Sequence, residues 1–165
     1  MKKAEKSFTV NGRGHLAIGG VDTLELAGQF GTPLYVFDEE AIRRTCRRYR
    51  EALGRSYGEG GLALYASKAF SCKEIYRIVG SEGLGADVVS AGELYTALEA
   101  GFVAAKIYYH GNNKTDDELL FAMEKGVGAI VVDNLPELRR LAKLRQRMDR
   151  DQDVLLRIKP GIDAH

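Results

Sequence analysis

The chain has 165 residues, a net charge of +1, 45% hydrophobic residues and 28% charged residues. This is the composition of an ordinary globular domain with a core of useful size. Acids and bases are spread along the whole chain, so no basic stripe favours a nucleic-acid partner. No run is long and apolar enough for a membrane span. Residues 1–10 lack the apolar stretch of a signal peptide, so we expect a cytoplasmic protein without a membrane partner.

The first part of the chain holds short apolar segments at Phe8–Val10 and Leu16–Ile18, followed by a small helix near Thr23–Phe30. A strand is predicted at Leu34–Phe37, where four apolar residues follow a proline. The next segment, from Asp38 to about Leu53, has the pattern of a helix.

Five arginines stand between positions 43 and 50 of this helix, and we interpret them as a solvated face. The two cysteines, Cys46 and Cys72, show no CxxC spacing and are expected to be reduced thiols. The three histidines are far apart and lack ligand spacing, so no metal site is predicted.

Strand-like and helix-like segments then alternate regularly along the chain. Strand-like apolar runs start near Leu62, Ala86, Lys106, Ala129 and Asp153, which places them about 20 to 25 residues apart. The segments between them have helical length and helical spacing of apolar residues. Strands that are almost continuously apolar suit a sheet covered on both faces, which means parallel strands joined by helical crossovers.

Signals for helix starts support this reading. Capping patterns, in which a side-chain oxygen accepts from free backbone N–H groups, occur at Ser71-x-x-Glu74, Ser90-x-x-Glu93, Thr115-x-x-Glu118 and Asn134-x-x-Glu137. Each follows a predicted strand. Glycines at 83, 101 and 126 recur where the helices should end.

These units leave two α/β folds, a (β/α)8 barrel and a doubly wound open sheet. Neither a GxGxxG fingerprint nor a GxxxxGK[ST] loop is present, which favours the barrel. A barrel typically needs about 250 residues. We therefore expect an incomplete barrel of about five βα units that ends at His165.

In both folds, ligands bind at the carboxyl ends of the strands. Lys68 follows an apolar strand there, and desolvation would make its amine a reactive Schiff-base group. Asp87, His110 and Arg157 end later strands and would share that rim. All four residues also have an ordinary structural interpretation. Lys68 would extend its amine to solvent and Asp87 would be a polar strand end. His110 would be a hydrogen-bonded core histidine, and Arg157 would pair with a nearby anion.

Several blocks resemble a known family. Tyr65-Ala-Ser-Lys-Ala-Phe70 resembles the cofactor-lysine motif of the alanine-racemase-like, pyridoxal-phosphate-dependent decarboxylases. The blocks that follow are similar to those of the diaminopimelate decarboxylases: Gly85–Tyr95, His110–Thr115, Ile130–Asp133 and Leu155–His165. The segment Thr32–Phe37 resembles the stretch that precedes the barrel in that family.

The resemblance implies a pyridoxal-phosphate barrel with a second β-domain. Residues 1–37 would belong to the β-domain, and residues 38–165 would form the first part of the barrel. The reaction would convert meso-2,6-diaminopimelate to L-lysine, with Lys68 holding the cofactor as a Schiff base. Asp87, His110 and Arg157 would lie near the cofactor. The resemblance also implies a homodimer.

Two departures from the family pattern limit this expectation. Phe70 replaces the usual asparagine after the lysine motif, and the family's later blocks do not occur in the 165 residues, which we therefore expect to be inactive alone. Three alternatives stay open: a related decarboxylase acting on other diamino acids or polyamine precursors, a non-catalytic remnant, and a short cofactor-carrier protein with the same barrel start.

Overall fold

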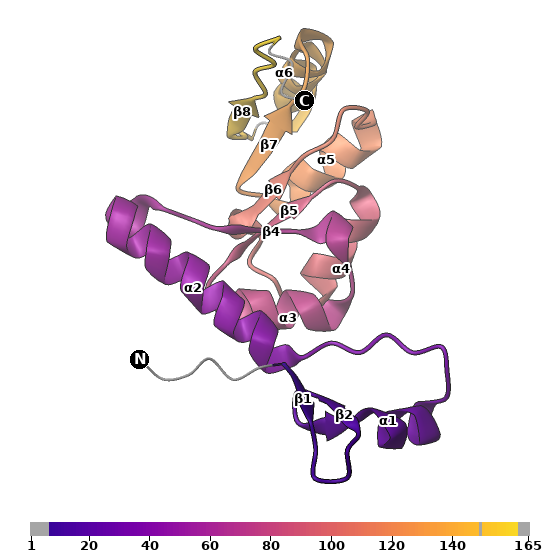
Figure 1. Cartoon of the computed structure of the whole chain (residues 1–165). Coiled ribbons are helices and arrows are strands. Elements are labelled where there is room, and N and C mark those ends of the chain that lie inside the picture. The colour runs from indigo at the N-terminus through magenta and orange to yellow at the C-terminus, as the bar shows by residue number, and fades with distance from the viewer. Residues whose placement is uncertain (1–6, 149, 162–165) are drawn as a thin grey trace.

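The computed structural model describes residues 7–148 and 150–161. A small antiparallel sheet comes first, built from β1 (Phe8–Val10), β2 (Leu16–Ile18) and β3 (Val21–Asp22). Helix α1 (Thr23–Phe30) follows at once, because Asp22 caps it by accepting from the backbone N–H of Leu24. Figure 1 places this small sheet apart from the larger one, with an extended segment leading from it to α2 (Glu39–Tyr57).

The prediction of a strand at Leu34–Phe37 is wrong. This segment pairs with no strand in the described part of the chain, and Tyr35 is 91% exposed. The apolar pattern indicated an extended backbone, but a strand also needs a neighbour to hydrogen-bond with. The segment instead meets the rest of the molecule through Phe37, whose ring stacks on Phe70 with centroids 4.5 Å apart.

The arginines of α2 do more than face solvent, so that interpretation is wrong in part. Arg43 and Arg47 both bind the carboxylate of Glu82, and Arg50 donates to the Glu82 backbone carbonyl. Glu82 is buried at the end of α3 (Lys73–Ser81). The basic run therefore fastens α2 to the turn that leads into the second strand of the large sheet.

The large sheet is parallel and follows chain order. Its strands are β4 (Leu64–Ala66), β5 (Gly85–Val88), β6 (Ile107–Tyr109), β7 (Ala129–Val132) and β8 (Val154–Leu156). Helices α3, α4 (Ala91–Glu99), α5 (Asp116–Lys125) and α6 (Leu135–Met148) join them, with short 3-10 turns at Gly58–Gly60, Ser67–Ala69 and Ala104–Lys106. A doubly wound sheet would reverse its strand order at a switch point, and this one does not. The arrangement is part of a (β/α)8 barrel, as expected.

Three of the four predicted helix starts are confirmed. Ser90, Thr115 and Asn134 each accept, through a side-chain oxygen, from the backbone N–H three residues further on. At Thr115 the Glu118 carboxylate also returns to the Thr115 backbone N–H at 2.9 Å, which completes a capping box.

The fourth start, at Ser71, is wrong. Helix α3 begins one residue later than that pattern requires, with Cys72 as its N-cap residue and no side-chain hydrogen bond there. The Ser71 hydroxyl lies 3.1 Å from the Tyr76 hydroxyl instead. The Ser71 side chain thus contacts a residue inside the helix and does not cap the helix start.

The core lies between the sheet and its helices. Alternate strand residues point into it, namely Ala86, Val88, Ile107, Tyr109, Ile130 and Val132. Side chains alternate along a strand, so the residues between them face the other side of the sheet. Asp87 lies on that opposite face, in register with Ala66 of β4 and Tyr108 of β6. This alternation places a carboxylate on the face that becomes the interior of a barrel.

Candidate active site

The carboxyl ends of β4, β5 and β6 bring together three of the four predicted site residues. His110 directly follows β6, and its backbone N–H donates to Val88 O of β5 at 2.8 Å. This bond sets the His110 ring beside Asp87, with His110 Nδ1 3.9 Å from Asp87 Oδ1. Lys68 follows β4, the neighbouring strand on the other side of β5.

Burial and charge act in opposite directions on Asp87. Desolvation raises the pKa of this carboxyl, while the nearby charges of His110 and Lys68 lower it to a smaller extent. Asp87 Oδ1 is buried and has no hydrogen-bond partner among the described residues. A buried carboxylate oxygen without a donor is costly, so the site is built to receive a donor from elsewhere.

Lys68 is not desolvated as its apolar neighbours suggested. It lies exposed in the short turn Ser67–Ala69, where Ser67 takes the buried position. The turn ends the strand one residue earlier than the apolar run implied and carries the lysine away from the strand. Lys68 is therefore accessible to a small molecule at the rim.

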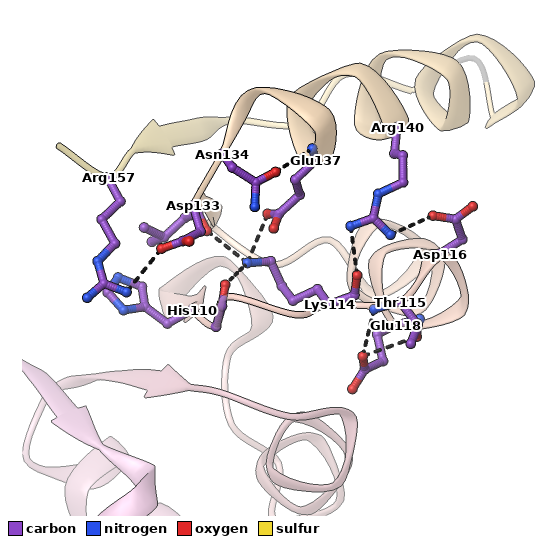
Figure 2. Close-up of polar contacts among 12 residues, drawn as sticks. His110, Lys114, Thr115, Asp116, Glu118, Asp133, Asn134, Glu137, Arg140 and Arg157 are labelled. Atoms are coloured by element: carbon purple, nitrogen blue, oxygen red, sulfur yellow. Dashed lines mark hydrogen bonds and ion pairs between the residues drawn. The ribbon is translucent and has the colours of Figure 1, made fainter. Parts of the chain in front are cut away.

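Arg157 lies elsewhere on the rim. It follows β8, and its guanidinium binds Asp133 at the end of β7 at 3.1 Å (Figure 2). Lys159 binds the other oxygen of Asp133 at 3.0 Å. The hydrogen bond from Lys159, with the charge of Arg157, lowers the pKa of the Asp133 carboxyl. An inward arginine needs an anionic partner, and for Arg157 this partner is the Asp133 carboxylate of the same chain.

The structure also contains a buried ion pair that the sequence did not indicate. Lys114 Nζ lies 2.9 Å from Glu137 Oε1, with the two side chains 2% and 0% exposed (Figure 2). The same ammonium donates to Gly111 O at 2.6 Å and to Val131 O at 2.9 Å. Gly111 thus offers its carbonyl to a cation.

The sequence pattern around Glu137 predicts a different contact for its carboxylate. Glu137 occupies the capping-box position after Asn134, where its carboxylate was expected to return to the helix start. The backbone half of that pattern forms, but the side chain turns inward to Lys114.

Comparisons with known proteins agree with this geometry. Residues 39–165 match the family model described as "Pyridoxal-dependent decarboxylase, pyridoxal binding domain". The chain belongs to this decarboxylase family. It is 50% identical over 155 residues to the diaminopimelate decarboxylase of Bacillus subtilis, an alignment that covers 94% of this chain and 35% of that protein.

Solved structures of the same decarboxylase family show the same fold. The diaminopimelate decarboxylase of M. jannaschii in complex with L-lysine superposes with a TM-score of 0.89 at 37% identity, over 96% of this chain and 37% of that one. The lysine/ornithine decarboxylase of Vibrio vulnificus, in complex with putrescine, superposes with a TM-score of 0.68 at 28% identity, over 82% and 35%. The chain spans about a third of the length of the relatives it matches.

The departure of Phe70 from the family's usual asparagine has a structural counterpart. The Phe70 ring stacks on Phe37, and its backbone carbonyl accepts from the Tyr65 hydroxyl at 2.7 Å. This decarboxylase chain thus replaces one polar side chain at the rim with an aromatic contact to the segment before α2. That contact ties the Lys68 turn to the connection between the two sheets.

The residues present fit a pyridoxal group. An accessible lysine amine can form a Schiff base with an aldehyde, and the unpartnered Asp87 oxygen can accept from a protonated group placed beside it. Within the described ranges, no group of three or more histidine, cysteine and acidic side chains could hold a metal ion. No described helix is long and apolar enough to cross a membrane.

Proposed function

We propose that this chain supplies the lysine-bearing strands of a decarboxylase that acts on meso-2,6-diaminopimelate. The C–C bond to one carboxylate breaks, CO2 leaves, and a proton takes its place to give L-lysine. Sequence identity favours meso-2,6-diaminopimelate over ornithine as the substrate. Two diaminopimelate decarboxylases are 50% and 37% identical to this chain, whereas the lysine/ornithine decarboxylase is 28% identical. The observation that carries the proposal is the grouping of Lys68, Asp87 and His110 at one rim of a pyridoxal-binding fold.

Pyridoxal phosphate, when bound, supplies the electron sink for the pair left by the departing CO2. Lys68 is the residue of this chain that would hold it, because its amine stands exposed at the end of β4. To hold the cofactor aldehyde as an amine nucleophile, Lys68 would have to give up a proton from Nζ.

Asp87 and His110 would support the reacting centre without bonding to it. Asp87 Oδ1 faces His110 Nδ1 at 3.9 Å and has spare acceptor capacity. His110 keeps its 40% exposed ring at the rim, where it can contact a planar group. Arg157 would act two strands further on, where its guanidinium pairs with Asp133.

The wider arrangement is inferred from the family resemblance of the sequence blocks. Residues 1–37 would belong to a second, β-rich domain, and residues 38–165 to the barrel. The full-length protein would act as a cytoplasmic homodimer on a small-molecule substrate.

The test is conversion of substrate by the full-length protein. Purified protein is incubated with pyridoxal phosphate and meso-2,6-diaminopimelate, and L-lysine and CO2 are measured together. Parallel reactions with ornithine, arginine and lysine separate this proposal from a polyamine-type decarboxylase. Equal or faster release of CO2 from ornithine would favour that alternative. Absence of release from all four substrates would favour a non-catalytic protein.

The position of the reactive lysine is tested separately. Borohydride reduction of the pyridoxal-phosphate-treated protein, followed by peptide mapping, should place the label on Lys68. Lys73 is a matched control, because it lies close by in sequence at the start of α3 and is 49% exposed. Lys68→Ala should lose the label and the activity, whereas Lys73→Ala should keep both. A label that stays on another lysine would overturn the assignment.

A further inference from the structure

The buried Lys114 ammonium holds two consecutive strands and a helix together next to the rim. Pairing between β6 and β7 ends at Tyr109 and Ile130. One residue further along β7, Val131 O accepts from Lys114 Nζ at 2.9 Å. The ammonium thus extends the link between the two strands beyond their last backbone pair.

Helix α6 binds both the side chain and the backbone of Lys114. Glu137 binds the ammonium, and three residues further along the same helix Arg140 donates to the Lys114 backbone carbonyl at 2.9 Å (Figure 2). Arg140 also binds Asp116 in the first turn of α5 at 3.1 Å. Residues three apart lie on one helix face, so a single face of α6 fixes the loop that joins β6 to α5.

This arrangement fixes the backbone around His110. Its own N–H is bound to Val88 O, and the next residue, Gly111, is held through its carbonyl by Lys114 at 2.6 Å. Gly111 has φ of 122°, a conformation that only glycine adopts readily. The backbone on both sides of the His110 side chain is therefore fixed, one side by β5 and the other by Lys114.

We propose that Lys114 and Glu137 are positioning residues that hold the His110 ring against Asp87. The proposal rests on the proposed function only in assigning His110 and Asp87 to the active site. Glu137 is the sole ion-pair partner of Lys114 in the described ranges, and its carboxylate lies 2.9 Å from the ammonium that donates to the two carbonyls. Neither side chain reaches the rim itself, since both are buried.

The alternative is that the pair only stabilises packing. Removing one partner of a buried ion pair leaves the other charge without compensation, whereas replacing both with apolar residues is often tolerated. A purely structural pair would thus be fully rescued by a double apolar replacement. A positioning pair would regain stability but not the placement of His110, because Gly111 O and Val131 O would still lack their donor.

The experiment compares four forms of the full-length protein: wild type, Glu137→Gln, Lys114→Met, and Lys114→Met/Glu137→Leu. Each is treated with diethylpyrocarbonate, and the modification rate of each histidine is followed by peptide mass spectrometry. His15 is the internal control. It lies in the small sheet, with Nδ1 2.8 Å from Asp22 Oδ2, far along the chain from Lys114. Thermal melting reports whether each form is folded.

We expect Glu137→Gln to melt below wild type and to raise the His110 modification rate, because it leaves the buried Lys114 ammonium without a compensating charge. The double variant should melt well above Lys114→Met, which leaves Glu137 without a compensating charge. His110 should still react at least about threefold faster than in wild type while His15 does not change, since the loop opens locally. The kcat/KM of the double variant should fall on the order of tenfold to a hundredfold, as for other small misplacements of a site.

A folded double variant with the wild-type His110 rate would overturn the proposal and leave the pair a packing element. The histidine rates need no catalysis, so failure of the proposed function would appear only as inactivity of the wild type. The two failures are therefore distinguishable.

Discussion

The guanidinium of Arg47 binds both carboxylate oxygens of Glu82, with Nε 2.9 Å from Oε2 and Nη2 2.8 Å from Oε1. Arg43 adds a third hydrogen bond at 3.1 Å. Two-point pairing of this kind fixes orientation as well as charge. It joins α2 to the turn before β5, the strand that carries Asp87.

Glu82 should make the protein sensitive to acid. The hydrogen bond from Arg47 is the main cause that lowers the pKa of the Glu82 carboxyl in the folded state. A lowered folded-state pKa contributes stability that is complete above the ordinary carboxyl value and is lost as the pH falls through the lowered one. Urea unfolding of wild type and Glu82→Gln should therefore differ most near neutral pH and converge in acid.

Glu25→Gln is the matched control for that measurement. Glu25 pairs with Arg13 at 2.8 Å, but both side chains are more than half exposed. An exposed pair contributes little. A Glu25 effect as large as the Glu82 effect, or a Glu82 difference that persists unchanged in acid, would contradict the assigned role.

The observed helix caps predict a difference between two residues with the same sequence pattern. Thr115→Ala removes a capping box and should cost about 0.5–2 kcal/mol in the free energy of unfolding. Ser71→Ala should cost less, because Ser71 caps no helix and its hydroxyl lies 3.1 Å from that of Tyr76. Denaturant unfolding of the two variants checks the order, and a larger loss at Ser71 would argue that α3 begins where its sequence pattern predicted.

Gly128 should tolerate no side chain. A Cβ at this position would meet the backbone carbonyl of Ala105, which cannot move aside as a flexible side chain would. Gly128→Ala should destabilise the protein by about 3 kcal/mol, at the upper end of overpacking costs. Gly28→Ala has open space inside the exposed helix α1 and should stabilise by about 0.5–1 kcal/mol. Unfolding curves that fail to separate the two glycines would contradict this packing.

The sequence predicted the parts of the fold that depend on local pattern. The five parallel strands and three of the four helix starts follow from apolar runs and capping residues, which act within a few positions of the chain. The strand expected at Leu34–Phe37 failed because pairing depends on a distant partner, which apolar residues alone cannot indicate.

The site was predictable to a smaller degree. The rule that ligands bind at the carboxyl ends of parallel strands singled out Lys68, Asp87 and His110, and the structure places all three at the ends of neighbouring strands. The rule gave neither the exposure of Lys68 nor the Asp133 partner of Arg157, since both depend on the turn geometry after each strand. The Lys114–Glu137 pair joins positions 23 residues apart on different elements, and only packing decides that the glutamate turns inward.

We expect the ionised Asp87 carboxyl to lower the free energy of unfolding of the protein without cofactor. Burial raises the pKa of this carboxyl in the folded state, so the folded protein favours the protonated form. A raised folded-state pKa means that stability decreases as the pH rises through that value, which is the reverse of the effect at Glu82. Functional sites commonly carry such a cost.

Asp87→Asn should therefore unfold at higher urea than wild type at neutral pH and lose this advantage in acid, where the wild-type carboxyl is protonated. Asn keeps the size of the side chain and removes the charge, so packing changes little. The same variant should bind pyridoxal phosphate more weakly, which its absorbance titration measures. A variant that is less stable at neutral pH would show that the pairing of Asp87 with His110 outweighs its burial.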